Sequence, residues 1–272
     1  MCLIYIKALD QGEEMKHLCK AIPAILNRAA MPRILGIYLL LTVGAAACLG
    51  ADFWEKKPYK EWSQKDCAKM LEDSPWAKTL TLTKVEIMAD ETAANATMGS
   101  GQQPYVKYQA QFRTAAPIRQ AIVRQTQLAQ KYDSLPPEQK QEFDKKVEEF
   151  LSTGSPDAIV VHVTYMANSQ TNELELARHW QSRTTDSLKN SVYLISSKGV
   201  RVPLAQYAVA QGGQHEFQFI FPRQYDGKPI LGPDDKSIKL EFAYPIVDTM
   251  GDGRAFMEFK VQKMTVGGKT EF

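Results

Sequence analysis

The sequence has few of the residues on which most catalytic and metal sites depend. Its 272 residues include only four Cys and four His. None of the His occurs in a metal-binding pattern such as two His at helical spacing with a Glu. Pairing of their two expected strands would bring His162 and His215 together, so a metal-dependent enzyme is the third hypothesis. We expect no metal and no cofactor.

The basic surplus that nucleic-acid binding requires is also absent. Residues 1–51 hold five of the 33 Lys and Arg and three of the 31 Asp and Glu, so the two signs are equal in number after residue 51. Phosphate neutralisation supplies most non-specific affinity for nucleic acid. The sequence therefore predicts no nucleic-acid partner.

Motifs for catalysis are missing as well. The chain has no Gly-x-Ser-x-Gly elbow, no phosphate-binding Gly-rich loop with Lys, and no acid pair typical of glycoside hydrolysis. We therefore assign no catalytic residue, and the sequence favours a protein that is not an enzyme.

The strongest local pattern lies in residues 31–51. Met31-Pro32-Arg33 gives a positive start, residues 34–43 are apolar, and residues 44–51 are mostly small. These are the three parts of a secretory signal peptide. An uncleaved membrane helix is the alternative, but small residues crowd the distal end, where an anchor would place Trp, Tyr, Lys or Arg. We expect an exported protein of the periplasm or cell envelope.

Two details qualify this expectation. Residues 1–30 are too few to bury a core, so we interpret them as a non-native extension, with translation starting at Met31. Ala46-Ala47-Cys48 resembles the end of a lipoprotein signal, although Ala45 stands where Leu is usual. Lipidation of Cys48 is thus an alternative to its removal, and the membrane is expected to be reached only through the signal segment or that lipid. If Cys48 is removed, Cys67 lacks a disulfide partner and is expected to be a buried apolar residue.

Residues 52–78 are unusually aromatic. Ser63 is placed to cap a short helix over residues 64–72, with Asp66 in the capping-box position. The aromatic residues form the candidate binding site, because Trp and Tyr stack on sugars and anchor protein partners. The simpler interpretation, which we favour, is that they pin this segment to the rest of the protein, because a polar segment needs such anchors to be ordered. The candidate residues are Trp54, Tyr59, Trp62 and Trp76.

The rest of the chain, residues 79–272, predicts a β domain. Val106, Tyr108, Ala110 and Phe112 alternate with polar residues, and several later segments alternate in the same way. Between about 116 and 154, apolar residues instead recur at helical spacing, which indicates a helical hairpin. Most of the strands lack the crossover helices that a parallel sheet needs. The pattern predicts an immunoglobulin-like antiparallel β-sandwich with an inserted helical hairpin and a short N-terminal helix.

Three stretches resemble a known group of proteins. They are residues 53–62 (FWEKKPYKEW), 74–76 (SPW) and 259–264 (FKVQKM). They are similar to uncharacterised exported proteins of Acidobacteria, over most of the chain after the signal segment. The resemblance implies export and a shared fold, and it implies no activity.

Three functions are therefore considered. The first is an envelope-associated binding or structural module, not an enzyme, whose partner is another envelope protein or a cell-wall polysaccharide. The second is a carbohydrate-binding or carbohydrate-processing sandwich that uses the aromatic cluster. The third is the metal-dependent enzyme. Burial of the three Trp would remove the sugar-binding surface.

Overall fold

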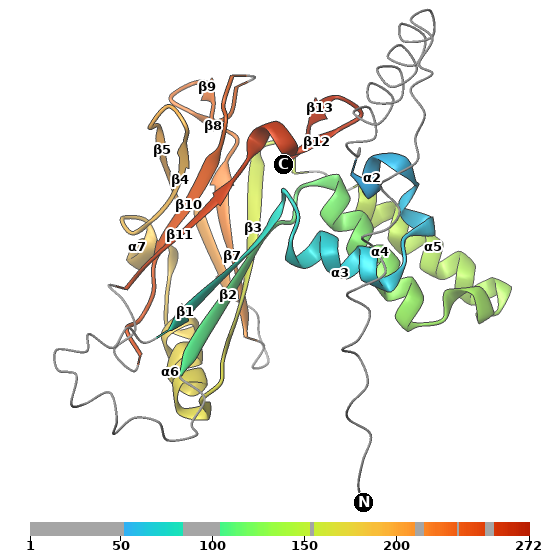
Figure 1. The fold of residues 1–272 in the computed structure, drawn as a ribbon, viewed down its shortest axis with the longest axis horizontal. Helices are drawn as coiled ribbons and strands as arrows, with labels where there is room; N and C mark the ends of the chain where they lie inside the picture. The colour runs from blue at the N-terminus through green and yellow to red at the C-terminus, as the bar shows by residue number, and fades with distance from the viewer. Residues whose placement is uncertain (1–51, 84–103, 153–154, 210–214, 233, 248–252) are drawn as a thin grey trace, which may run out of the picture. The chain divides into compact units, whose positions relative to one another are not determined.

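The structure is a computed structural model that describes residues 52–83, 104–152, 155–209, 215–232, 234–247 and 253–272. The segment Asp52–Phe272 forms one compact unit. The expected extension (residues 1–30), the signal segment (residues 31–51) and Cys48 lie outside the described residues. Figure 1 shows the described chain coloured from the N-terminus to the C-terminus.

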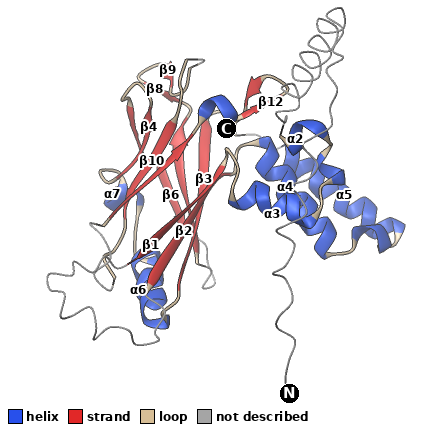
Figure 2. Cartoon of the chain, in the orientation of Figure 1, coloured by secondary structure: helices blue, strands red, loops and turns tan. Residues whose placement is uncertain are grey.

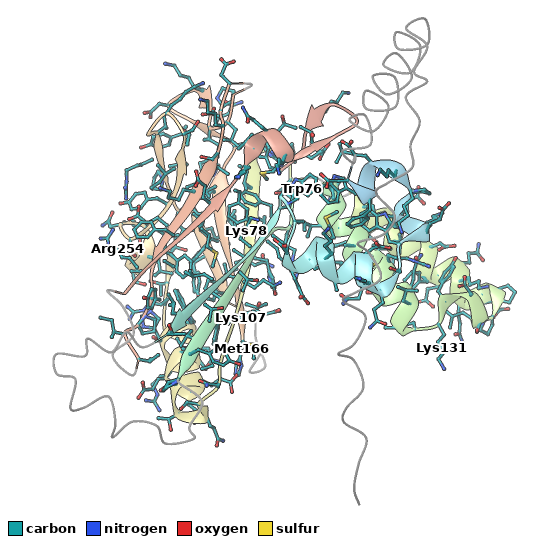
Figure 3. All side chains as sticks on the ribbon, viewed as in Figure 1. Trp76, Lys78, Lys107, Lys131, Met166 and Arg254 are labelled. Atoms are coloured by element: carbon teal, nitrogen blue, oxygen red, sulfur yellow. The ribbon has the colours of Figure 1, made fainter. Side chains whose placement is uncertain are left out.

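The larger sheet has five antiparallel strands. Their order is β1 (Ala77–Thr83), β2 (Tyr105–Phe112), β3 (Ala158–Ala167), β7 (Glu216–Pro222) and β6 (Gln206–Val209). Side chains alternate between its two faces, so Tyr108 is buried while the paired residues Lys107 and Met166 point outward (Figure 3). The alternation predicted from residue 106 onward is confirmed.

A four-stranded antiparallel sheet lies opposite. Its order is β11 (Arg254–Phe259), β10 (Ile238–Ala243), β4 (Val192–Ser196) and β5 (Arg201–Pro203). Two short ribbons pair β8 (Gln224–Tyr225) with β9 (Lys228–Pro229) and β12 (Thr265–Val266) with β13 (Lys269–Thr270).

Aromatic rings join the two sheets into one core. Phe112 of β2 meets Phe259 of β11 with ring centroids 4.8 Å apart, and Phe242 of β10 lies 5.4 Å from Tyr108. All four side chains are fully buried. The fold is therefore mainly antiparallel β with helical additions, consistent with a β-sandwich (Figure 2).

Helices precede the first strand and separate several others. They are α2 (Phe53–Lys56), η2 (Tyr59–Glu61), α3 (Gln64–Glu72), α4 (Ala116–Ala129), η3 (Tyr132–Ser134), α5 (Pro137–Ser152), α6 (Gln170–Gln181), α7 (Thr185–Leu188) and η4 (Val261–Lys263). The first three carry the aromatic N-terminal segment, and α4, η3 and α5 lie in sequence between β2 and β3. Figure 2 shows the helices α2 to α5 gathered together.

Helix α3 begins where its capping residues predict. The Ser63 hydroxyl accepts a hydrogen bond from the Asp66 backbone nitrogen at 3.2 Å, and the Asp66 carboxylate accepts one from the Ser63 nitrogen at 2.9 Å. Lys57 lies 2.7 Å from the same carboxylate. The Lys57 and Ser63 hydrogen bonds lower the pKa of Asp66 to about 2. Cys67 lies on the buried face of this helix, as expected.

The end of the chain differs from the prediction. The sequence from Gly251-Asp252-Gly253 onward would fit one long strand from Arg254 to about Met264. In the structure β11 stops at Phe259 and a 3-10 turn follows. The Val261 nitrogen donates to the Lys236 carbonyl at 3.0 Å instead of continuing the ladder. A hydrogen bond made by a distant segment thus ends a strand that local alternation would extend.

Candidate functional site

Two of the four candidate aromatic residues are buried. Trp76 is fully buried, and its indole nitrogen donates to the Glu271 carbonyl at 2.5 Å; Figure 3 shows its position at the start of β1. Trp62 is 1% exposed, and its indole nitrogen donates to the Lys57 carbonyl at 3.2 Å. Neither ring presents a face to a ligand.

The other two residues, Trp54 and Tyr59, are half-buried, and they do not form an exposed surface on which a sugar could stack. The Trp54 ring packs edge-on against Trp76 with centroids 5.5 Å apart, and Tyr59 packs against the core. The sugar-binding surface that the sequence allows from all four rings does not form. The reason is that the segment needs these apolar rings as anchors, because it otherwise has little to bury.

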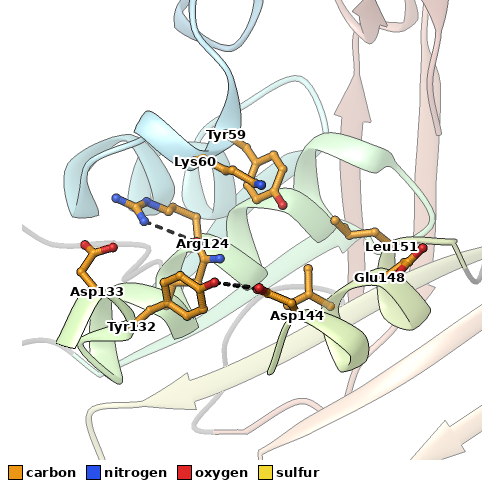
Figure 4. Close-up of a pocket in the computed structure, with 10 residues that line it drawn as sticks. Tyr59, Lys60, Arg124, Tyr132, Asp133, Asp144, Glu148 and Leu151 are labelled. Atoms are coloured by element: carbon orange, nitrogen blue, oxygen red, sulfur yellow. Dashed lines mark hydrogen bonds between the residues drawn. The ribbon is translucent and has the colours of Figure 1, made fainter. Parts of the chain in front are cut away.

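Tyr59 nevertheless lines a pocket, which Figure 4 shows in close-up. The pocket has a volume of about 530 Å³ and lies where η2 meets α4, η3 and α5. Tyr132 supplies a second aromatic wall. Its other side chains are mostly charged or polar: Lys60, Arg124, Gln127, Asp133, Asp144 and Glu148, with Val147 and Leu151 at one side.

Hydrogen bonds fix the polar groups of this pocket. The Tyr132 hydroxyl lies 2.8 Å from both oxygens of Asp144 (Figure 4). Donation to this carboxylate raises the pKa of Tyr132. Arg124 donates through Nε to the Trp62 carbonyl at 3.0 Å and through Nη1 to Gln127 at 3.3 Å. The pocket thus combines two phenol rings with both signs of charge, a composition suited to a polar ligand with an apolar face.

A second concavity lies on another side of α4 and α5. This groove, of about 660 Å³, is lined by apolar side chains from both helices and has a polar rim. On the rim, Glu142 and Lys146 form an ion pair of 2.6 Å. Its apolar lining consists of Ile122, Val123, Leu135, Phe143, Val147 and Phe150.

The groove is open because α5 packs weakly. No residue of α5 is buried, and the Phe150 side chain is 41% exposed. Exposed apolar side chains grouped in a concavity are typical of interaction sites. The helical spacing of apolar residues in the sequence predicts an apolar face on α5. Whether other parts of the protein cover that face cannot be read from the spacing alone.

The two histidines face different carboxylates and are not paired across the sheet: His162 lies in β3 opposite Gln218, and His215 directly precedes β7. His162 Nε2 lies 3.3 Å from a Glu216 carboxylate oxygen, without the geometry of a hydrogen bond, and His215 Nδ1 lies 3.1 Å from Glu173. Burial, with a smaller effect from Arg113, lowers the pKa of His162 to about 3. In the part of the chain that the structure describes, no three His, Cys, Asp or Glu side chains group as metal ligands.

Cys67 is fully buried on α3, and burial raises the pKa of its thiol. A raised pKa favours the neutral thiol over the nucleophilic thiolate. Within the described ranges, no helix has both the length and the apolar character needed to cross a membrane.

Comparisons with known proteins add no assignment. No protein-family model, no curated protein and no solved structure matches the chain. The two concavities beside α4 and α5 are therefore the candidate sites.

Proposed function

We propose that this chain is a binding module of the cell envelope, not an enzyme, and that it holds another envelope protein through the groove between α4 and α5. Residues 31–51 direct export, and Cys48 is either removed with them or lipidated. The two sheets form an immunoglobulin-like sandwich, and α4 with α5 is a helical hairpin inserted into it. The resemblance to exported proteins of Acidobacteria supports export and this fold.

One observation carries the proposal: a 16-residue helix without a buried residue exposes apolar side chains toward an open groove. Phe143 and Val147 are half-buried, and Phe150 lies at the solvent edge. Burial of such side chains by a partner removes apolar surface from water, which favours association.

The form of the groove favours a helical partner. Two helices that lie side by side leave a linear apolar depression, into which a third amphipathic helix places residues at spacings of three and four. The Glu142–Lys146 pair on the rim offers both signs of charge, so it can pair with either sign on the partner. We expect the partner to contribute a helix with large apolar residues.

Exchange of one exposed side chain tests the proposal. Phe150→Ser should remove an apolar ring from the edge of the groove and reduce co-purification of cross-linked partners from the native envelope, measured by quantitative mass spectrometry. Leu174→Ser is the matched control, because Leu174 is 60% exposed on α6, away from the groove. Recovery of the same partners in the same amounts with Phe150→Ser would contradict the proposal.

A cell-wall saccharide is the second candidate ligand, and the pocket of Figure 4 supports it. Tyr59 and Tyr132 supply ring faces, and Asp133, Asp144 and Glu148 supply acceptors for sugar hydroxyls. Titration with soluble cell-wall fragments should show saturable binding that Tyr59→Ala weakens. Tyr193→Ala, on β4, is the control. Equal binding by both variants would exclude this pocket.

A further inference from the structure

A smaller pocket lies where α3 and α4 meet the outward face of β2. Its volume is about 300 Å³. Gln109 and Gln111 project into it from β2, and Arg113 follows directly after the strand. Ala68, Leu71 and Ile122 form an apolar wall, while Glu72 and Gln125 are exposed at its rim.

The two Gln side chains are fixed by one carbonyl. Gln109 and Gln111 both donate an amide hydrogen to the Leu71 carbonyl, at 2.8 and 2.6 Å. This carbonyl lies in the last turn of α3, where helix carbonyls need partners from outside the helix. The hydrogen bond from Gln111 Nε2 to the Leu71 carbonyl restricts rotation of the amide group. The position of Gln111 Oε1 is therefore fixed as well.

Gln111 Oε1 has no hydrogen-bond partner among the described residues, although Gln111 is only 7% exposed. A buried acceptor without a partner is unfavourable. A donor from a bound molecule would satisfy this oxygen, and the pocket that Gln111 lines has room for one.

Arg113 presents the complementary group. Its Nε is buried and also lacks a partner in the described chain. Glu216 acts on Arg113 only through its electrostatic field and lies against the His162 ring instead. A guanidinium without a carboxylate partner offers a planar fork of donors that matches a carboxylate.

We propose that this pocket binds a small α-amino acid. Its carboxylate lies on Arg113, its ammonium group lies between Gln111 Oε1 and the Glu72 carboxylate, and its side chain faces Leu71 and Ile122.

Charge and spacing favour a zwitterion over a simple anion or amine. A lone anion would meet repulsion from Glu72, and a lone amine would leave Arg113 unpaired. Gln111 and Arg113 are two residues apart, so their Cα atoms are separated by roughly 6–7 Å in extended backbone. An ammonium and a carboxylate on one carbon bridge such a span through two hydrogen bonds. The pocket volume, at the low end for ligand sites, restricts the side chain to a small one.

Calorimetric titration of the full chain tests the proposal with three probes. L-alanine carries both charged groups, propionate lacks the ammonium group, and L-alaninamide lacks the carboxylate. We expect saturable binding of L-alanine and binding of either analogue weaker by about tenfold or more, as the loss of one charged hydrogen bond predicts. Equal affinity for propionate, or no saturable binding of L-alanine, would overturn the proposal.

Two variants locate the binding site. Arg113→Gln should weaken L-alanine binding by about tenfold, and Glu72→Gln, at an exposed position, by about threefold. Arg183→Gln and Glu55→Gln are the controls: Arg183 also has a buried Nε without a partner in the described chain, but neither residue lines this pocket. If Arg113→Gln fails to fold, Glu72→Gln at an exposed position decides the matter, and unchanged affinity there refutes the proposal. Phe150→Ser should bind L-alanine normally, which separates this test from that of the groove.

Discussion

Aromatic side chains between the sheets of the sandwich are buried, whereas on the α4–α5 pair one of them is exposed to solvent. Between the sheets, Trp180 is fully buried, and its ring lies 4.2 Å from that of Phe217. Its indole nitrogen donates to the Tyr108 hydroxyl at 3.3 Å, so even its polar atom is satisfied. On α5, Phe150 is 41% exposed, and no residue of that helix is buried.

This difference separates residues that hold the fold from residues available to a partner. An apolar side chain left in water contributes little to folding, whereas the same side chain covered by a partner contributes to binding. The sandwich therefore supports the molecule, and the surface beside α4 and α5 is where we place its interactions. Four predictions test this contrast.

At neutral pH, the largest effect is expected in the sandwich. Trp180→Ala should lower the free energy of unfolding by about 3–5 kcal/mol, because it leaves a cavity among packed rings and removes the hydrogen bond to Tyr108. Chemical denaturation followed by far-UV circular dichroism measures this loss. A loss below about 1 kcal/mol would show that the core is looser than its ring contacts indicate.

The second effect depends on pH and on the outward face of the larger sheet. His162 is 4% exposed, and its pKa in the folded state is about 3, against 6.5 when exposed. Between pH 3 and pH 6.5, His162 therefore binds a proton in the unfolded chain but not in the folded chain. Stability should fall as pH drops from 6.5 towards 3, by up to about 1.4 kcal/mol for each pH unit.

His162→Gln tests this assignment. The variant should lose stability less steeply below pH 6.5, as measured by denaturation at several pH values. A remaining slope is expected from His179, whose pKa burial lowers to about 4. An unchanged slope in His162→Gln would show that His162 is not the group responsible.

Much of this fold was predictable because burial on one face leaves a period in the sequence. The alternation from Val106 to Phe112 marks β2, and Ser63 with Asp66 marks the start of α3. Both signals are local. The strand end at Phe259 was not predictable, because the Lys236 carbonyl that ends it comes from another segment.

The candidate site was less predictable for the same reason. Whether Trp76 is exposed depends on the Glu271 carbonyl, which lies 195 residues further along the chain. Alternation correctly placed Gln111 and Arg113 off the sheet core, but it could not show that Leu71 and α4 enclose them in a pocket. Sites formed by distant segments leave no pattern in either segment alone.

The third effect concerns the helix that joins the aromatic segment to the sandwich. Ser63→Ala should cost about 1 kcal/mol of stability, because the Asp66 nitrogen loses its capping acceptor. The contribution of Asp66 itself is present above its unfolded pKa of 3.8 and is lost as pH falls towards 2, its folded value. Unfolding measured at neutral pH and at pH 2 distinguishes the two contributions. If Ser63→Ala is neutral, α3 is held by packing and not by its cap.

The smallest effect on stability is expected where we place the function. Phe150→Ser should change the free energy of unfolding by less than about 0.5 kcal/mol, since the ring is already 41% exposed. Leu174→Ser should behave alike in this measurement, although only Phe150→Ser is expected to reduce partner capture. A loss of several kcal/mol in Phe150→Ser would mean that the ring belongs to the folding core. The contrast between the two regions would then fail, and with it the argument that this groove is kept open for a partner.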